Sequence, residues 1–330
     1  MFRMREMSDK SPLIVAIGNV SVDLSLKVSS PPKRGGEVLA SEFYLGGGGA
    51  ASNMALAVAR LGLKARFLGC VGDDEYSSLA LKELMEEGVD LSFVKTVKRG
   101  TGVVVVLVEE SGERTMIAYR GANLEVSEKL VTQASIGDAT SLHISSLSGT
   151  KTLKILKRAR SINPKLICSY DPGGSVSSED VMACLRHLNI LLLNCSELRE
   201  LTGAHTVNEG VRVLTELNPE LLIVVKEGAR GSSLYRGELY WNVPAFDVRA
   251  VDTTGAGDSF NAAFLVGYHI GLSPNDLLVF SNAAAALKVK RRGARAAPTL
   301  DEVLKFLKEK GFGKLSNEIR MRIRKATEIK

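Results

Sequence analysis

Short apolar runs alternate with helical patterns along most of this 330-residue chain. The first run, Leu13 to Ile17, is continuously apolar, which is typical of a strand buried on both faces. Further strands are expected at residues 67–71, 141–144, 166–169, 190–193, 221–225 and 232–235, with helices between several of them. Strands connected by helices form a mostly parallel sheet with helices on both faces. The sequence therefore predicts an α/β fold in three layers, α/β/α.

Two segments interrupt this alternation and indicate a second, smaller sheet. Residues 22–45 alternate only weakly between apolar and polar positions and contain two prolines and two glycines. Residues 102–120 contain two strand patterns, at 103–108 and 115–119, joined by a short polar turn. This is the pattern of a β-hairpin. We expect the two segments to pair with each other outside the main sheet.

The composition is that of an ordinary globular protein, with 45% hydrophobic and 24% charged residues. The length allows one large α/β domain or two domains. No apolar run approaches the length that spans a bilayer, so no contact with a membrane is expected. The first ten residues carry charges of both signs and do not resemble a secretory signal. The four cysteines are scattered, which predicts reduced thiols in a cytoplasmic protein and no metal cluster.

The net charge of +6 is concentrated near the end of the chain, where lysines and arginines outnumber glutamates beyond residue 307. We therefore divide the chain into a main domain, residues 11–312, and a basic C-terminal extension, residues 313–330. A basic extension can bind nucleic acid. This one lacks interleaved aromatic residues and any recognisable binding module, which favours a solvated helix over a nucleic-acid contact.

A glycine-rich stretch at residues 251–260 precedes a helical pattern and indicates an anion site. Gly255, Ala256 and Gly257 carry almost no side chain, so their N–H groups can all face one ligand at the positive end of a helix. Asp258 would repel a phosphate there, unless it accepts a proton from the group that attacks the phosphate. The alternative is that Asp258 simply caps the helix.

A second glycine-rich stretch, residues 46–53, opens another helix. Gly48 and Gly49 allow a ligand to approach the backbone closely, and Asn53 offers both a donor and an acceptor to a hydroxylated molecule. Asp23 follows the first strand, at the edge of the sheet where ligands of α/β proteins bind. The alternatives are a glycine hinge before a plain core helix and a turn-forming Asp23. The chain lacks G-x-x-x-x-G-K-[ST], so a P-loop is excluded.

Polar residues also follow other strands. Asn194 and Glu197 come directly after the buried run at 190–193, where a carboxylate can hold Mg²⁺ through water. Alternatively, Ser196 caps a helix that has Glu197 in its first turn. Arg120, at the end of the hairpin, can reach an anionic or hydroxylated substrate or can be an ordinary surface charge.

Two of these elements together resemble the PfkB/ribokinase family of carbohydrate kinases. Residues 48–53 (GGAASN) look like its N-terminal Gly-Gly-x-x-x-Asn element, and residues 252–258 (DTTGAGD) look like its C-terminal D-T-x-G-A-G-D element. The resemblance extends from about Leu13 to the helix after Thr299. Both elements, in this order and on an α/β pattern, are highly specific. The fold that the resemblance implies is the ribokinase-like α/β/α sandwich with a small β-sheet lid.

The resemblance implies an ATP-dependent kinase. Asp258 would be a base of nearly unperturbed pKa that deprotonates the hydroxyl of the acceptor. An anion hole would stabilise charge on the transferred phosphoryl group, and its members would be Gly255, Ala256 and Gly257. The sugar would be held by four residues, Asp23, Gly48, Gly49 and Asn53.

The resemblance also implies a nucleotide side that binds ATP with Mg²⁺. Asn194 and Glu197 match an N-x-x-E element linked to Mg²⁺ and phosphate. The other positions that match the nucleotide side are Lys226, Gly228, Gly231 and Asn282. Asp252 and Thr254 match positions that bind a monovalent cation in some members, so K⁺ is a further candidate. The segments at 22–45 and 102–120 would form the lid, which in related proteins often pairs between subunits and so implies a homodimer.

Two positions depart from ribokinases proper, which carry Lys after the paired glycines and Glu after the mid-chain strand. This chain has Ala50 at the first position and reads HISSL at residues 143–147. These differences argue against free ribose as the substrate. They leave open a nucleoside, fructose, another sugar, or a phosphosugar for which Arg120 would be an anion anchor.

The sequence thus predicts transfer of the γ-phosphoryl group of ATP to a hydroxymethyl group of a sugar or nucleoside. The alternative is a non-catalytic ligand sensor on the same fold, with the basic extension contacting nucleic acid. A sensor would have no need of the carboxylate of Asp258. A Rossmann oxidoreductase is disfavoured, because the first strand–helix turn lacks G-x-G-x-x-G.

Overall fold

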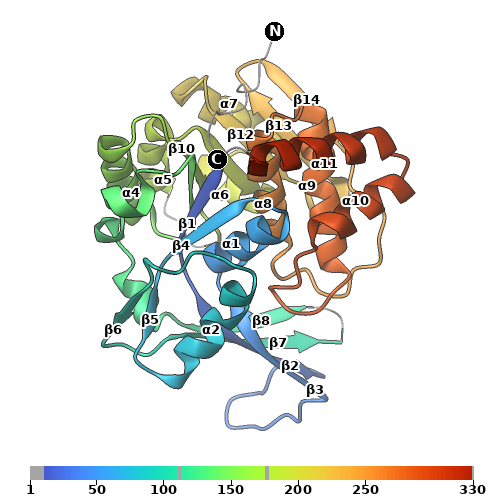
Figure 1. Cartoon of the computed structure of the whole chain (residues 1–330). Helices are drawn as coiled ribbons and strands as arrows, with labels where there is room; N and C mark the ends of the chain where they lie inside the picture. Colours follow the sequence, from blue (N-terminus) through green and yellow to red (C-terminus); the bar gives the residue numbers. More distant parts are fainter. Residues whose placement is uncertain (1–10, 111–112, 175–177, 329–330) are drawn as a thin grey trace.

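The central sheet is built from strands that lie far apart in the sequence (Figure 1). The computed structural model describes residues 11–110, 113–174 and 178–328. Within these residues the sheet has eight strands, in the order β14-β13-β12-β11-β10-β9-β1-β4. Their bounds are β1 Leu13–Gly18, β4 Lys64–Leu68, β9 Ser141–Ser145, β10 Ile167–Asp171, β11 Ile190–Asn194, β12 Leu222–Lys226, β13 Ser232–Arg236 and β14 Leu239–Val243.

The strands from β12 to β4 are parallel, and β13 and β14 continue the sheet antiparallel. The predicted mostly parallel sheet is therefore confirmed. The alternation of apolar runs did not reveal β14, because this edge strand is mostly exposed and lacks a continuous apolar run. A separate two-stranded sheet pairs β5 (Cys70–Gly72) with β6 (Lys95–Val97).

The register brings the carboxyl ends of the parallel strands to one edge. Gly18 of β1 pairs with Ser145 of β9, which also pairs with Asp171 of β10. Asn194 of β11 pairs with Lys226 of β12. Polar side chains that follow different strands are therefore collected at a single edge of the sheet, where ligands of open α/β sheets bind.

Helices cover both faces of the central sheet and complete three layers. Their bounds are α1 Ala50–Arg60, α2 Glu75–Glu86, α3 Gln133–Ile136, α4 Gly149–Ile162, α5 Ser178–Cys184, α6 Cys195–Thr202, α7 Val207–Leu217, α8 Ala256–His269, α9 Pro274–Val289, α10 Leu300–Glu309 and α11 Gly313–Glu328. Ile14 and Ala16 of β1 share a core with α1, α8, α9, α10 and α11. Val15 and Ile17 point to the other face and share a core with α4, α5, α6 and α7.

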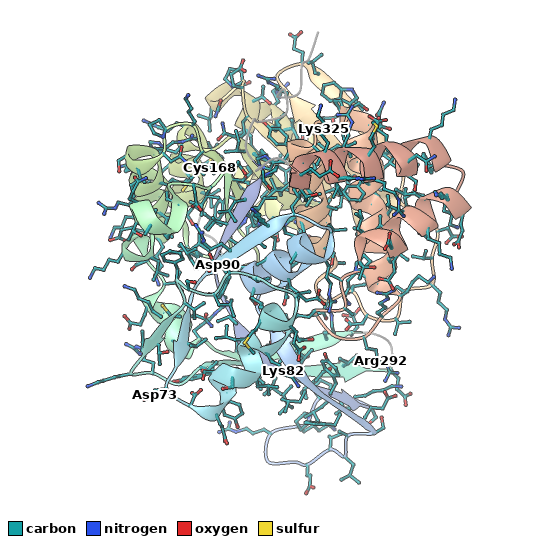
Figure 2. The ribbon with its side chains drawn as sticks, in the orientation of Figure 1. Asp73, Lys82, Asp90, Cys168, Arg292 and Lys325 are labelled. Atoms are coloured by element: carbon teal, nitrogen blue, oxygen red, sulfur yellow. The ribbon has the colours of Figure 1, made fainter. Side chains whose placement is uncertain are left out.

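The two segments that interrupt the alternation form the predicted second sheet, which we call the lid. Its strands are β2 Ser21–Val28, β3 Glu42–Gly48, β7 Gly102–Glu109 and β8 Arg114–Tyr119. They pair in the order β3-β2-β7-β8, with β2 and β7 parallel. In Figure 1 the lid lies at the bottom of the view, below the central sheet and beside α2. An ion pair between Arg292, which Figure 2 labels, and Glu42 of β3 connects the lid to the loop after α9.

The C-terminal segment is a helix, α11, that contributes one face to the main core. Its apolar side chains recur at helical spacing, and Leu315, Ile319 and Ile323 are buried in the same core as α8 and α9. Arg322 donates to the carbonyl oxygen of Gly271 at 2.7 Å. The basic side of the helix, which includes Lys325, is exposed (Figure 2). Within the described residues, no helix has the length and apolar character needed to cross a membrane.

Candidate active site

Two helices begin at the cavity between the central sheet and the lid, and both begin with a glycine. Gly49 precedes α1 with φ 98°, and Gly255 precedes α8 with φ 78°, a backbone conformation that favours glycine. A Cβ atom at Gly255 would lie 2.1 Å from the carbonyl oxygen of Ala294. Glycine has no side-chain oxygen with which to cap a helix. No side chain therefore caps the first N–H groups of either helix. Two of these groups, the N–H of Ser52 and that of Ala256, donate to backbone carbonyl oxygens at 3.4 Å and 3.2 Å.

The first turns of α1 and α8 meet through one hydrogen bond. Asn53 donates from Nδ2 to Oδ2 of Asp258 at 2.9 Å. Burial raises the pKa of Asp258 to about 7, and repulsion from Asp171 adds to this rise, whereas the hydrogen bond from Asn53 opposes it. The sequence-based expectation of a nearly unperturbed pKa was therefore wrong. Its alternative, that Asp258 caps the helix, is also wrong, because the N-cap is Gly255.

The two helix ends open into a cavity of about 270 Å³. Its walls come from the lid, from the ends of β1 and β9, and from the starts of α1 and α8. Seven of the predicted site residues line it, namely Asp23, Gly49, Asn53, Arg120, Thr254, Gly255 and Asp258. Gly48 lies directly beneath, because a Cβ atom there would come within 2.1 Å of the Asp23 carboxylate. Burial raises the pKa of Asp23, and a hydrogen bond from Ser21 at 2.7 Å opposes this shift.

Arg295 lies behind Gly48 and Asn53 at this cavity, and sequence reasoning missed it. The residue is only 2% exposed, and its side chain forms an ion pair with Glu83 at 3.2 Å. It donates to the carbonyl oxygen of Gly48 at 3.2 Å and to Oδ1 of Asn53 at 3.4 Å. The amide oxygen of Asn53 is thereby occupied, which turns the amide NH₂ toward Asp258. The only available signal was a single arginine within an otherwise apolar stretch, residues 294–297.

A buried network of opposite charges lies on the other side of α8, at the ends of β10 and β12. Lys226 forms an ion pair with Asp171 at 2.6 Å, and Asn261 of α8 donates to the same carboxylate oxygen at 2.5 Å. Burial opposes charge on both partners, but their attraction holds the pKa of Asp171 below and that of Lys226 above its usual value. A Cβ atom at Gly257 would lie 3.6 Å from Nζ of Lys226. The ammonium group therefore lies beside the predicted anion hole; Asp171 and Asn261 were not predicted.

Asn194 and Glu197 satisfy each other in a capping box at the start of α6. Asn194 accepts hydrogen bonds from the N–H groups of Ser196 and Glu197, so Asn194 and not Ser196 is the cap. Oε2 of Glu197 accepts from the Asn194 N–H at 2.8 Å. Burial raises the pKa of Glu197, as does repulsion from Asp171, and Lys226 opposes both.

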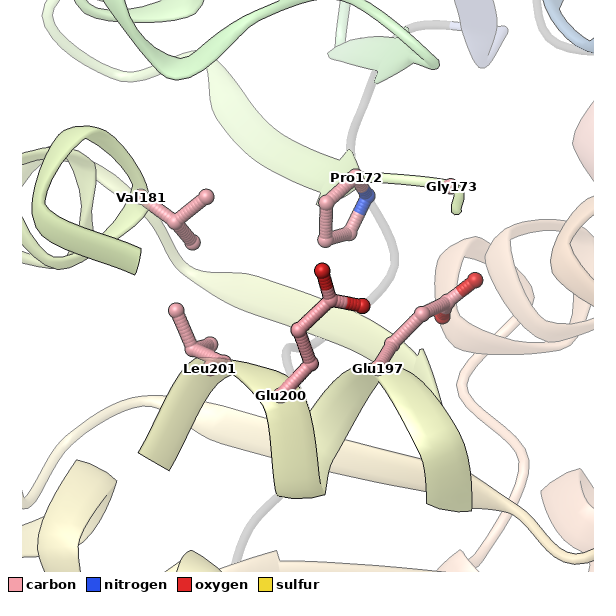
Figure 3. A pocket seen from close by; sticks show the side chains of 6 residues that line it. All are labelled: Pro172, Gly173, Val181, Glu197, Glu200 and Leu201. Atoms are coloured by element: carbon pink, nitrogen blue, oxygen red, sulfur yellow. The ribbon is translucent and has the colours of Figure 1, made fainter. Parts of the chain in front are cut away.

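Glu197 and Glu200 also line a small pocket on the other side of this helix start. Figure 3 shows their carboxylates above α6, facing Pro172 and Gly173. The pocket has a volume of only about 10 Å³, which is at the lower limit for one water molecule. The larger cavity at Asp258 is therefore the better candidate for binding a substrate.

The predicted nucleotide residues occupy a neighbouring turn and helix. Gly228 and Gly231 have φ values of 62° and 109°, and a Cβ atom at Gly231 would lie 2.1 Å from the carbonyl oxygen of Val243. Asn282 of α9 donates to the same carbonyl oxygen at 3.1 Å and accepts from Ser232 at 2.9 Å. The two hydrogen bonds of Asn282 thus connect α9 to β13 and β14.

The predicted cation residues lie under the start of α8. Asp252 accepts from the N–H of Thr254 at 2.8 Å and from the N–H of Gly293 at 2.9 Å. Arg114 of the lid donates to the hydroxyl of Thr254 at 2.5 Å. Lys288, which was not predicted, donates from its ammonium group to the carbonyl oxygen of Asp252 at 2.9 Å. Burial lowers the pKa of Lys288 to about 8, and the Asp252 carboxylate opposes this shift.

The chain is similar to known carbohydrate kinases. Residues 11–300 match the family described as pfkB family carbohydrate kinase. The chain is 33% identical to an ATP-dependent ribose-1-phosphate kinase of Halopiger xanaduensis, over 90% of this chain and 98% of that protein.

Two solved structures share the fold. A ribokinase from Thermotoga maritima has a TM-score of 0.80 and 30% identity, over 90% of this chain and 99% of that chain. Arabidopsis thaliana ribokinase complexed with ribose and ATP has a TM-score of 0.77 and 28% identity, over 91% of this chain and 99% of that chain. These similarities confirm the predicted three-layer, ribokinase-like fold.

Proposed function

Because the chain belongs to the pfkB family of carbohydrate kinases, we propose that it transfers the γ-phosphoryl group of ATP to a hydroxymethyl group of a sugar, with Asp258 as the base. The family and the relatives make the chain an ATP-dependent sugar kinase, so the non-catalytic sensor is not retained. The observation that carries the finer proposal is the Asp258 carboxylate, which Asn53 holds at the N-terminus of α8 inside the main cavity.

The proposed step begins when Asp258 accepts the proton of the acceptor hydroxyl. The hydroxyl oxygen then attacks the γ-phosphorus, the bond to the bridging oxygen of the β-phosphate breaks, and ADP leaves. A pKa of about 7 suits this role, because a general base works best when its pKa lies near the working pH. Negative charge on the transferred group would be stabilised by the N–H groups of Gly255, Ala256 and Gly257. The ammonium group of Lys226 would add positive charge beside them.

The nucleotide would lie next to the cavity, at the ends of β11 and β12. Gly228, Gly231 and Asn282 would shape its wall. Mg²⁺ is held mainly by phosphate oxygens and water, so a single carboxylate suffices on the protein side. Glu197 fits this requirement, because only Oε2 is bound to the backbone of Asn194. When bound, Mg²⁺ would offset the negative charge of the phosphates.

The sugar would occupy the lid side of the cavity, held by Asp23, Asn53 and the backbone at Gly48 and Gly49. We propose a phosphosugar as the acceptor, because Arg120 brings a positive charge to this side of the cavity. Its guanidinium forms no ion pair with any described residue, so it is available to an anionic group of the substrate. The Halopiger xanaduensis relative is named for such a substrate, ribose-1-phosphate.

A substrate panel tests this proposal. ATP consumption is measured with free pentoses, hexoses, nucleosides and pentose 1-phosphates, first with the unaltered protein. We expect the highest kcat/KM for a phosphosugar. Arg120→Gln should raise the KM for that substrate about 10-fold or more, since a charge-assisted contact is lost. The matched control is Arg34→Gln in the exposed loop between β2 and β3, which should leave KM unchanged. A higher kcat/KM for a free sugar, or equal effects of the two variants, would contradict the phosphosugar proposal.

The lid carries apolar side chains on its outer surface, and for this reason we propose a homodimer formed through the lid. Phe43 and Ile117 are each more than half exposed. Exposed apolar patches of this kind mark contact surfaces between proteins. Sedimentation equilibrium of the unaltered protein should give twice the chain mass of 35.5 kDa, and Ile117→Glu should give a monomer. A monomer at all concentrations of the unaltered protein would refute the dimer.

A further inference from the structure

Lys288 is a charged side chain enclosed by protein. It belongs to α9, and its exposed fraction is 0%. Burying an ammonium group is unfavourable unless oxygen atoms replace the water that it loses. The partners of Lys288 therefore indicate what the surrounding structure requires at this position.

Those partners are oxygen atoms from the loop after α9 and from the loop that precedes and supports α8. Nζ of Lys288 donates to the carbonyl oxygen of Asp252 at 2.9 Å and to that of Arg291 at 3.1 Å. It also lies 3.8 Å from a carboxylate oxygen of Asp252. Carbonyl oxygens together with a nearby carboxylate are the surroundings that K⁺ takes in proteins. In this chain an ammonium group already occupies them.

The loop that precedes α8 also fixes the position of the predicted anion hole. The N–H of Asp252 donates to the carbonyl oxygen of Val289 at 3.1 Å, and the Asp252 carboxylate accepts from Thr254 and Gly293. The negative charge of Asp252 is therefore half-buried in the loop that precedes Gly255. Lys288 provides a positive charge beside this carboxylate from within the chain.

We propose that the ε-ammonium group of Lys288 takes the place of a monovalent cation, so that this kinase requires no K⁺. The family resemblance implied K⁺ at Asp252 and Thr254, but the observed oxygen set does not fit an added ion, because Lys288 fills it. The inference rests on the proposed function only in assigning a catalytic role to the loop above Lys288. Its structural part, a filled cation site, stands without it.

The first test uses the unaltered full-length protein, with nucleotide and buffer free of alkali cations and Mg²⁺ present. Turnover is compared in potassium, sodium, ammonium and N-methylglucamine chloride at constant ionic strength. We expect rates that agree within about twofold and a melting temperature that K⁺ does not change, since an ion that does not bind cannot stabilise the fold. Activation by K⁺ of about 10-fold or more would overturn the proposal.

The second test empties the site. Lys288→Met keeps the length of the side chain and removes its charge, whereas Lys290→Met removes an exposed charge two residues away. In N-methylglucamine, Lys288→Met should lose turnover about 10- to 100-fold and regain most of it in K⁺ or ammonium. K⁺ should also raise the melting temperature of Lys288→Met and of neither other protein.

The melting-temperature measurement needs no substrate, so it separates a failure of this proposal from a failure of the proposed function. A Lys288→Met protein whose melting temperature does not respond to K⁺ would contradict a cation site at Asp252. If Lys288→Met does not fold, the cation series on the unaltered protein still decides the question.

Discussion

Two kinds of helix N-terminus occur among the described residues, and the difference separates binding from structure. α6, α7 and α10 begin with capping boxes, in which the pairs are Asn194 and Glu197, Thr206 and Glu209, and Thr299 and Glu302. Their first N–H groups are satisfied by the chain itself. α1 and α8 have Gly49 and Gly255 at the N-cap instead, so no side chain caps these groups at the cavity. A missing cap at two neighbouring helices is therefore a sign of a ligand site.

The comparison also separates two acidic residues that look alike in the sequence. Asp258 and Glu197 both lie in the first turn of a helix. The carboxylate of Glu197 caps its own helix by accepting a hydrogen bond from a backbone N–H, whereas that of Asp258 accepts one from Asn53 on another helix. We therefore expect substitutions in the first turn of α8 to lower turnover most strongly, and substitutions in the first turn of α6 to lower it weakly.

The largest effect is expected from Asp258→Asn. Loss of the base should lower kcat about 10³-fold, whereas the Kd for ATP should change little. The same substitution should stabilise the fold above pH 7. Because the pKa of Asp258 rises from 3.8 to about 7 on folding, the unaltered protein loses stability as pH rises from about 4 to 7, and an amide does not.

The gain in unfolding free energy should be roughly 1 to 3 kcal/mol at pH 8, discounted because the carboxylate is partly exposed to the cavity. It should vanish near pH 4. Isothermal titration with ATP, turnover assays and urea unfolding at both pH values measure the three quantities. Near-normal turnover of Asp258→Asn would remove Asp258 as the base, and equal stabilities at pH 8 would contradict the raised pKa.

A smaller effect is expected at the closed end of α6. Glu197→Gln and Glu209→Gln both preserve a capping box, since glutamine can replace glutamate there. Glu197→Gln should lower kcat/KM for ATP about 10-fold, because a charge near the phosphates is removed. Glu209→Gln on α7 is the matched control and should leave activity unchanged. If the two variants behave identically in ATP and Mg²⁺ titrations, Glu197 has only a capping role.

The fold and part of the cavity could be predicted from the sequence because their signals are local. Continuous apolar runs indicated the parallel strands, and two glycine-rich stretches indicated the starts of α1 and α8. The placement of Asp23, Asn53 and Asp258 around one cavity agrees with that prediction. The pairing of the two lid segments could also be predicted, because both interrupt the alternation of strands and helices.

The buried charges could not be predicted, because each depends on partners from distant parts of the chain. Arg295 contacts Glu83, and Lys226 contacts Asp171, across long sequence separations. Lys288 follows an alanine-rich segment with a helical pattern. Its hydrogen-bond partners are backbone carbonyl oxygens, which every residue has and which the sequence therefore cannot indicate. The pKa of Asp258 is likewise set by burial.

The pH dependence of turnover by the unaltered protein tests the role of Asp258 most directly. kcat/KM for the sugar is measured from pH 5 to 9 with Mg²⁺ and ATP saturating, and is corrected for ionisation of the substrate. If Asp258 must be deprotonated to act, kcat/KM should rise about tenfold per pH unit below about 7 and level off above it. A profile that stays flat between pH 5 and 8 would contradict Asp258 as a base whose pKa is raised by burial.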